Sequence, residues 1–492
     1  MKKKLFYLAV TVITGFLFSF NIFSQQNSLW LRNLSESIGA PVTGYEDFAT
    51  EIASSGNVVH TLWLTWKGDM KELNYRRSPD NGLTWAPKVT LFEDNLDYDR
   101  RYRRMAVSDN FVHIVVNENI GTDRQLVYFR STDGGATFEP AKVLYSTQFW
   151  IYQVNIDAEG TKVRISMAED CHFCGVKKWI YLIKSDDNGT NFENKLVTED
   201  VYGAYTDFTS LTISGQNIYL LYRKGIGYWA NYDFELRLLS SSDGGNNFTD
   251  QVLSQPAMSG EHHVFQLLDF NNVYNNKIAV DGNKIWVVWS GWDETNTPTI
   301  FVRHSANAGA TFGPLKKISG TLTIFQAGLE TIAARGNNVY VALNTTNALI
   351  YKNQSNDGGN TFSGFTEFTR PNSNYLRNAV EPQLYIDPDD NGAWLIATGA
   401  IMGKLLPDGN EIRPSYYGYW GFNTSRRPRL AVSSSGFLHL IMESGGEWTQ
   451  TGGFTHLNLW YRRINLNPTD PGQGNQGPNK DIIPNPGEGK GL

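Results

Sequence analysis

One eight-residue pattern, S-x-D-x-G-x-[TN]-[WF], occurs six times in this chain and constrains its fold more than any other feature. The copies are Ser78–Trp85, Ser131–Phe138, Ser185–Phe192, Ser241–Phe248, Ser305–Phe312 and Ser355–Phe362. Their first serines lie 50 to 64 residues apart, and the copy at Ser305 carries Asn307 in place of the aspartate. A period of this length with strand-like flanks is typical of a repeat architecture in which each period is one structural unit.

Each copy has the composition of a tight turn between two strands. The Asp side chain can accept hydrogen bonds from backbone N–H groups of the turn, and a glycine supplies a positive φ. The Trp or Phe that ends the pattern then returns under the turn and packs into the sheet. We therefore expect each copy to be a self-contained hairpin plug that needs neither a metal nor a ligand.

The pattern resembles the Asp-box, or BNR, repeat of sialidases and related β-propellers, and the resemblance covers residues 45–365. It implies an all-β fold, namely a single β-propeller of eight, alternatively seven, four-stranded blades. We expect strands in the first unit at Asp47–Ala53, Val58–Trp66, Glu72–Ser78 and Lys88–Phe92. Alternation in Val112–Asn117 is typical of a half-buried strand. The box is structural in that family, so the resemblance predicts the fold better than the chemistry.

The period continues beyond the last box. Val380–Ile386 and Ala393–Thr398 have the pattern of first and second strands, and Pro407–Asn410 is a degenerate turn at the place of a box. A further unit over residues 429–465 lacks an outer strand, which Leu29–Asn33 could supply. Eight units follow from this count, and a ring closed by strands from both ends of the chain would leave no exposed sheet edge.

Both ends of the chain differ from the repeats. Residues 1–24 combine a basic start with a short apolar run and predict a secretory signal peptide, with an uncleaved anchor as the alternative. Residues 25–466 would form the propeller. Residues 467–492 are rich in Pro, Gly and Asn and predict a flexible tail; their end resembles the start of a type IX secretion sorting domain. We therefore expect an exported monomer in the periplasm, at the cell surface or outside the cell, with no later membrane span.

The charge and the cysteines narrow the function further. A net charge of −6 argues against a nucleic-acid partner. The only cysteines are Cys171 and Cys174, with His172 between them. In an exported protein this spacing favours a local disulfide, while a zinc site would need two further ligands and free thiols are the third reading. We predict neither a cofactor nor a metal.

Strands of a blade alternate in direction, so the loops between second and third strands share a face with the connections between blades. The boxes lie on the other face, and a ligand is therefore expected opposite to them. Arg, Tyr, His and Trp concentrate in the loops of that face. The candidates are Arg101, Arg104, His172, Tyr228, Trp229, His262, His263 and Arg377. Arginine forks suit carboxylates and sulfates, and aromatic planes suit sugar rings.

Other histidines have a simpler interpretation. His60, His113 and His439 occupy the same place in successive second strands, so we interpret them as structural. His304 stands directly before a box and is expected to be structural too.

A sialidase would carry an F-R-I-P motif before the first blade, and this sequence contains none. The chain is also similar to propeller lyases that act on uronates, including ulvan lyases. Their chemistry removes the proton at C5 of a uronic acid and expels the group at C4, after a cationic group has neutralised the carboxylate. The face opposite to the boxes offers these residue types.

The leading hypothesis is therefore β-elimination on acidic, uronate-containing oligosaccharides, sulfated or not, as a lyase or a dehydratase. Arg101, Arg104 and Arg377 would hold the carboxylate or sulfate, with Trp229 against the sugar. His263 would be the base, with His262 or His172 as rivals, and Tyr228 the acid. A sialidase-type glycoside hydrolase and a non-catalytic glycan-binding propeller are the alternatives.

Overall fold

The computed structural model describes part of the chain. The described residues are 32–34, 45–67, 70–94, 103–120, 123–171, 177–200, 207–226, 233–254, 277–293, 295, 297–320, 322, 330–345, 349–368, 382–387, 389–397, 401–412, 426–444 and 458–465. Their regular secondary structure is entirely β, which confirms the predicted class. Within these ranges we find no helix with the length and apolar character needed to span a bilayer.

The strands form eight antiparallel sheets of four strands each. The first strands of the sheets are β2 (Tyr45–Ser55), β6 (Arg103–Ser108), β10 (Trp150–Glu159), β14 (Asp207–Ser214), β18 (Ile278–Asp281), β22 (Thr331–Arg335), β26 (Gln383–Ile386) and β30 (Arg426–Val432). The second strands are β3 (Val58–Lys67), β7 (Phe111–Ile120), β11 (Lys162–Cys171), β15 (Asn217–Ile226), β19 (Lys284–Trp292), β23 (Asn338–Asn344), β27 (Ala393–Ala397) and β31 (Phe437–Ser444).

The third and fourth strands complete each sheet. The third strands are β4 (Met70–Ser78), β8 (Asp123–Ser131), β12 (Lys177–Ser185), β16 (Asp233–Ser241), β20 (Pro298–Ser305), β24 (Ile350–Ser355), β28 (Ile401–Leu405) and β32 (Asn458–Asn465). The fourth strands are β5 (Val89–Asp94), β9 (Lys142–Thr147), β13 (Glu193–Asp200), β17 (Thr249–Val252), β21 (Lys316–Lys317), β25 (Thr366–Glu367), β29 (Glu411–Ile412) and β1 (Arg32–Asn33).

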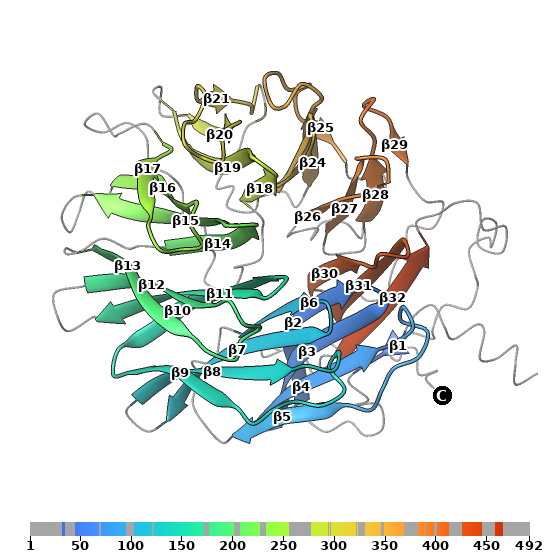
Figure 1. The fold of residues 1–492 in the computed structure, drawn as a ribbon. Helices are drawn as coiled ribbons and strands as arrows, with labels where there is room; N and C mark the ends of the chain where they lie inside the picture. Colours follow the sequence, from blue (N-terminus) through green and yellow to red (C-terminus); the bar gives the residue numbers. More distant parts are fainter. Residues whose placement is uncertain are drawn as a thin grey trace, which may run out of the picture.

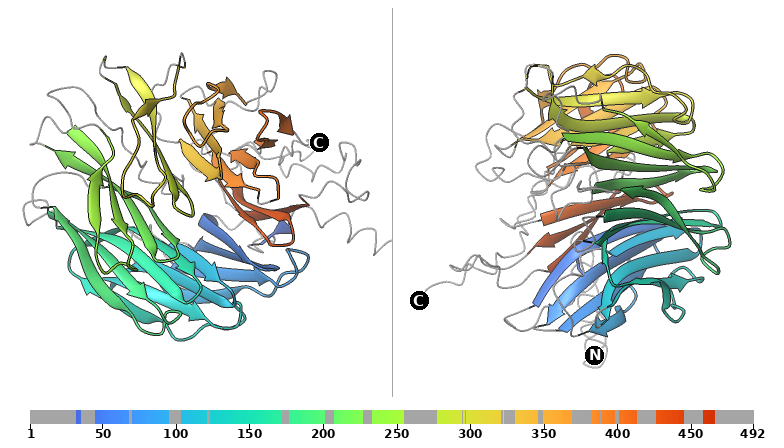
Figure 2. Two further views of the ribbon diagram at one scale, coloured as in Figure 1. Left: turned by 45° about the horizontal axis from the view of Figure 1, so that its top comes forward. Right: turned by 90° about the vertical axis from the view of Figure 1, so that its left-hand side faces the viewer.

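The sheets follow one another around the molecule in chain order, in the radial arrangement of a propeller (Figure 1). The first strands of successive sheets lie next to each other from β2 through to β26, and β30 of the last sheet lies against β2 of the first. Figure 2 shows the same arrangement from two further sides, with the sheets of the two chain ends adjacent. We call the sheets the first to the eighth, in the order of β2, β6, β10, β14, β18, β22, β26 and β30.

The eighth sheet is completed from the other end of the chain, as the sequence predicted. β1 pairs antiparallel with β32, with Arg32 opposite Tyr461 and Asn33 opposite Trp460. Beyond this strand, the backbone N–H of Leu34 donates to the carbonyl of Leu459 at 2.8 Å. The edge of β32 is thereby covered, as sheet edges in stable β proteins usually are.

The apolar core is divided among the interfaces between sheets. One cluster joins Leu62 and Leu64 of the first sheet to Ile114 and Val116 of the second, and other clusters join later pairs of sheets in the same way. The prediction that residues 112–117 alternate between buried and exposed is therefore wrong, because all six side chains are buried. A sheet that packs against a neighbour on each face has no solvent side.

The box turns have the predicted geometry. In the first box, the Ser78 hydroxyl donates to the Asp80 carboxylate at 2.8 Å and accepts the Gly82 N–H at 2.7 Å. The Asp80 carboxylate also accepts the backbone N–H of Thr84 at 2.8 Å. Gly82 has a φ of +80°, and the serine hydroxyl bonds the Asp at the third position, or Asn307, in the other boxes too. These bonds close each turn without any outside group.

Three boxes are supported by a buried His–Tyr pair from the preceding sheet. His113 Nδ1 lies 2.6 Å from the hydroxyl oxygen of Tyr128, and that hydroxyl lies under Gly189 of the next box, where a Cβ would meet it at 1.9 Å. The pairs His60–Tyr75 and His439–Tyr461 repeat this contact. The structural interpretation of these three histidines is confirmed.

Candidate functional site

The boxes and the turns between first and second strands share one face of the molecule. Each box donates a backbone hydrogen bond to the turn of its own sheet, for example from Asn81 to the carbonyl of Asn57 at 2.8 Å and from Gly134 to that of Asn110 at 2.7 Å. We call this side the box face. First strands therefore begin on the opposite face, together with the connections between sheets.

The predicted site residues lie mostly outside the described part of the chain. This holds for Arg101, His172, Tyr228, Trp229, His262, His263 and Arg377. Arg104 is the exception, and it lies in strand β6 rather than in the loop before it, because β6 begins at Arg103. Whether the eight residues converge on one pocket stays a prediction.

Arg104 forms an ion pair with a carboxylate of the neighbouring first strand. Its Nη1 atom lies 3.1 Å from Oε1 of Glu51 in β2 and also donates to the carbonyl of Arg103 at 2.8 Å. The side chains of Arg104 and Glu51 are only 9% and 14% exposed. Such a pair is held more firmly than a surface salt bridge, because its partners cannot exchange freely with water.

Two further arginines act on the same carboxylate. Arg103 comes from β6 and Arg429 from β30, so Glu51 lies between cationic groups of both neighbouring sheets. We call Glu51, Arg103, Arg104 and Arg429 the arginine cluster. Burial raises the pKa of Glu51 above its usual value, and Arg104, Arg429 and Arg103 oppose this with their positive charge. Arg104 thus pairs with Glu51, and Arg103 and Arg429 add positive charge near the same carboxylate.

Irregularities in two strands accompany this arrangement. The register of β2 against β3 shifts between Phe48 and Glu51, and the register of β30 against β31 shifts between Arg426 and Arg429. A bulge changes the direction of the side chains that follow it. Glu51 and Arg429 each stand directly after such a shift. The sequence analysis missed both residues, since a register shift leaves no mark in the hydrophobic pattern.

A second buried charge pair lies where the fifth and sixth sheets begin. Lys277 directly precedes β18 and Glu330 directly precedes β22, and Nζ of Lys277 lies 2.6 Å from Oε1 of Glu330. The same oxygen accepts the backbone N–H of Ser290 at 3.1 Å. Burial lowers the pKa of Lys277, against the attraction of Glu330. This pair joins two neighbouring sheets on the face opposite to the boxes.

The end of β11 carries the predicted disulfide. Cys171 is disulfide-bonded, and the sequence leaves Cys174 as its partner within the chain. Nearby, Glu169 accepts hydrogen bonds from the hydroxyls of Tyr145 and Thr147. The zinc and free-thiol readings of these cysteines are therefore wrong. Within the described ranges, no three His, Cys, Asp or Glu side chains gather as metal ligands would.

Comparisons with known proteins give similarity at the level of solved structures. Neither a family model nor a curated protein matches the chain. The polysaccharide lyase Uly1 is similar with a TM-score of 0.49 and 10% identity, over 85% of this chain and 89% of that one. Hadza microbial sialidase Hz136 follows with a TM-score of 0.39 and 12% identity, over 83% and 77%. An α-L-arabinanase of Penicillium chrysogenum has a TM-score of 0.37 and 12% identity, over 64% and 92%.

Proposed function

We propose that this protein is an exported enzyme that acts on acidic, uronate-containing oligosaccharides by β-elimination, as a lyase or a dehydratase. The observation that supports the proposal most directly is the arginine cluster. The Arg104 guanidinium pairs with the Glu51 carboxylate, and Arg103 and Arg429 of the neighbouring first strands add positive charge near it. Guanidinium groups bind carboxylates and sulfates in a fixed geometry, which an acidic sugar offers.

The reaction needs three functions from the protein. A cationic group neutralises the uronate carboxylate, which makes the proton at C5 easier to remove. A base takes that proton, the electron pair forms the C4–C5 double bond, and the C4–O bond breaks. An acid then protonates the leaving oxygen, so that a sugar hydroxyl or a water molecule is released.

The residues assigned to these functions are those the sequence predicted, extended by the cluster. Arg104, together with Arg101 and Arg377, would hold the carboxylate, and Trp229 would contact the sugar. His263 would be the base, with His262 or His172 as rivals, and Tyr228 the acid. Glu51 would be a positioning residue, because it fixes the guanidinium of Arg104 before substrate arrives.

The test is incubation with uronate-containing oligosaccharides while the ultraviolet absorbance of the new C4–C5 double bond is recorded. We expect absorbance to rise with the wild-type protein and the rate to fall at least about a hundredfold with Arg104→Met. Arg130→Met removes a guanidinium on the box face and is the matched control, for which the rate should hardly change. A flat trace over the substrates would sink the proposal.

The same assay separates the alternatives. Release of reducing sugar without new absorbance would select a hydrolase of the sialidase type. Binding without turnover, unchanged by His263→Ala, would select a glycan-binding propeller. These outcomes differ from failure of the arginine assignment, in which absorbance rises but Arg104→Met has no effect.

We propose further that the eight sheets are the blades of one closed propeller over residues 25–466. The contact of β30 with β2 and the pairing of β1 with β32 support this. Removal of residues 29–34 should then lower the melting temperature, and no change would contradict closure. Export with cleavage after Ser24 would give a mature N-terminus at Gln25, which the intact mass of the secreted protein can check.

A further inference from the structure

A carbonyl group at the fourth position of each box receives a side-chain hydrogen bond from the preceding sheet, with one exception. The donors and acceptors are Arg463 to Asn81 at 3.3 Å, Arg77 to Gly134 at 3.0 Å, Arg130 to Asn188 at 3.1 Å, Tyr219 to Ala308 at 3.4 Å and Trp286 to Gly358 at 2.8 Å. The equivalent residue of the remaining box is Gly244. Among the described residues no side chain donates to its carbonyl.

The exception has a cause in the third sheet. Lys184 occupies the position of Arg77 and Arg130, directly before the box serine, but its ammonium group bonds Oδ1 of Asn246 instead. It also pairs with the carboxylate of Glu193, at 3.3 Å. The ammonium group of Lys184 bonds Asn246 and Glu193, whereas the longer planar fork of arginine bonds the carbonyl at the other two junctions. Lys184 therefore reaches the Asn246 side chain of the next box and not the Gly244 carbonyl.

A second departure from the repeat lies beside it. Arg164 occupies the position that holds His60, His113 and His439 in the first, second and eighth sheets. Its guanidinium is turned to Asp186, with Nη2 at 2.6 Å from the carboxylate, and its Nε is buried without a partner within the described residues. The junction between the third and fourth sheets is thus built differently from its neighbours.

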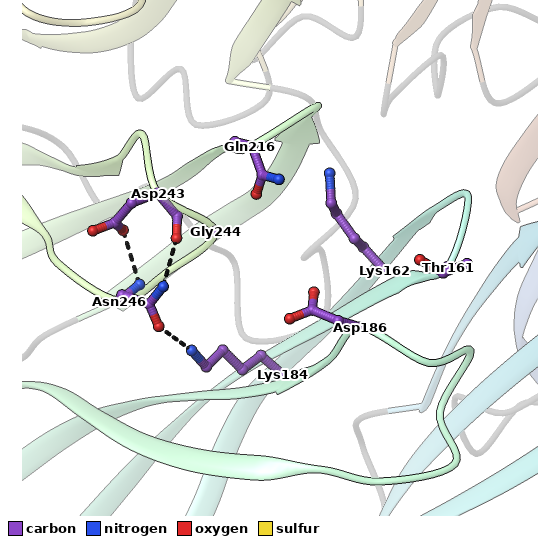
Figure 3. Close-up of a pocket in the computed structure, with 8 residues that line it drawn as sticks. All are labelled: Thr161, Lys162, Lys184, Asp186, Gln216, Asp243, Gly244 and Asn246. Carbon is purple, nitrogen blue, oxygen red and sulfur yellow. Dashed lines mark hydrogen bonds between the residues drawn. The ribbon is translucent and has the colours of Figure 1, made fainter.

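A cavity of about 410 Å³ opens at this junction (Figure 3). Its walls come from the turns and boxes of the third and fourth sheets, and its side chains include Lys162, Lys184, Asp186, Gln216 and Asn246. Lys162 donates to the carbonyl of Gly215 at 2.7 Å, which leaves two of its protons for another acceptor. The volume lies within the range of small-molecule sites, roughly 300–1,000 Å³.

The lining decides which ligand chemistry fits. No apolar or aromatic side chain lines the cavity, so neither an apolar ligand nor a stacked ring is favoured. Two lysines face two aspartates, Asp186 and Asp243, so neither sign of charge is favoured. A cation could not accept hydrogen bonds from the amide and ammonium groups of the lining. An anion could not donate a hydrogen bond to the Gly244 carbonyl. A hydroxyl group both donates and accepts hydrogen bonds, so it can pair with each polar group of the lining.

We propose that this cavity is a second saccharide site, which binds an uncharged sugar unit through its hydroxyl groups. One hydroxyl takes the place of the missing arginine bridge and donates to the carbonyl of Gly244. Others accept from Lys162 and Gln216 and donate to Asp186. The site lies on the box face, so it is separate from the arginine cluster and does not depend on the proposed reaction.

The test introduces an arginine that can donate a hydrogen bond from the third sheet to the Gly244 carbonyl. Lys184→Arg should place a guanidinium against the Gly244 carbonyl and occupy the cavity, as Arg77 and Arg130 do in their junctions. Binding of xylobiose, cellobiose and lactose is measured by saturation-transfer NMR and titration calorimetry. We expect weak binding of at least one disaccharide to the wild-type protein and at least about a tenfold loss in Lys184→Arg.

Three further variants make the result specific. Gln216→Ala removes an exposed wall residue and should also weaken binding, without filling the cavity. Lys142→Arg makes the same change at the junction of the second and third sheets, where the Arg130 bridge is present, and should have no effect. Lys284→Met, at the equivalent turn of the fifth sheet, should leave neutral-sugar binding unchanged.

The proposal is overturned by two outcomes. One is that none of the three disaccharides binds to the wild-type protein. The other is binding that survives both Lys184→Arg and Gln216→Ala. Thermal melting of each variant shows whether it is folded, and Lys184→Arg should melt at or above the wild-type temperature because it adds a contact between sheets.

Discussion

The box face and the opposite face of this molecule bury polar side chains in different ways. On the box face a neutral contact recurs in several sheets, as in His113 with Tyr128, beside single ion pairs such as Lys404 with Asp387. On the opposite face the buried groups are ionic and differ between sheets, as in Glu51 with Arg104 and in Lys277 with Glu330. A contact that recurs serves the stacking of sheets. A buried charge that occurs once has no such explanation and marks a candidate site.

The largest loss of stability is expected from breaking a buried ion pair on the face opposite to the boxes. Glu330→Leu leaves the ammonium group of Lys277, which is 2% exposed, without its carboxylate. Breaking a buried pair from one side costs about 3–5 kcal/mol of unfolding free energy. Urea unfolding should show this loss, and the double variant Lys277→Met with Glu330→Leu should recover most of it. A double variant no more stable than the single one would show that the charge pair is not the cause.

A comparable loss is expected in a box, for a steric reason. A Cβ at Gly135 would lie 1.8 Å from the hydroxyl oxygen of Tyr75, and Gly135 has a φ of +80°. Gly135→Ala should therefore cost about 3 kcal/mol in urea unfolding. Gly160→Ala is the matched control, because its φ is +57° but nothing lies within 4 Å of its Cβ. Its cost should be about 1 kcal/mol, and equal losses would contradict the role of Tyr75.

The two faces should respond to acid with opposite signs. Burial lowers the pKa of His113 in the folded state to about 4. Between this value and the higher pKa in the unfolded chain, only the unfolded chain takes up the proton, so stability decreases as the pH decreases. From pH 7 to 5 this histidine should cost about 2 kcal/mol. His113→Gln should lose less stability on acidification than the wild-type protein.

Glu51 makes the opposite contribution. Burial raises its pKa, so the folded state binds the proton more tightly and is favoured as the pH falls. Glu51→Gln should therefore lose more stability on acidification than the wild-type protein, by urea unfolding at pH 7 and 5. If the unfolding free energies of His113→Gln, Glu51→Gln and wild type changed equally with pH, the opposite responses of the two faces would be contradicted.

The smallest effect concerns the bridges between sheets. Arg130→Lys should remove the hydrogen bonds to the Asn188 carbonyl and to Thr190, at 3.1 Å and 2.7 Å, and cost about 1 kcal/mol. The variant would give the junction of the second and third sheets the lysine that Lys184 provides at the junction of the third and fourth sheets. Thermal melting of Arg130→Lys and Lys184→Arg should shift in opposite directions, and shifts of the same sign would count against a common bridge.

The repeated parts of the fold could be read from the sequence because each depends on local residues. The serine, the aspartate and the glycine of a box contact each other within five residues, so the motif contains its own structure. The pairing of β1 with β32 followed from the count of strands in the last unit. The function of His60, His113 and His439 followed from their equal places in the repeat.

The arginine cluster could not be read in the same way. Glu51 and Arg104 are partners only because two first strands of neighbouring sheets lie side by side, and Arg429 joins them from the other end of the chain. Register shifts in β2 and β30 set which side chains arrive there. Arg104 was identified because its run of arginines is visible in sequence, whereas a single Glu51 within a strand is not.

The pairing of β1 with β32 also governs the order in which this chain can reach its final state during synthesis. Residues 32–33 leave the ribosome more than 400 residues before their partners at 460–461. At about 5–20 residues per second, the first segment waits roughly 20–80 s for the last. Completion of the fold is therefore the final event, and an interrupted translation product retains an unpaired strand at each end.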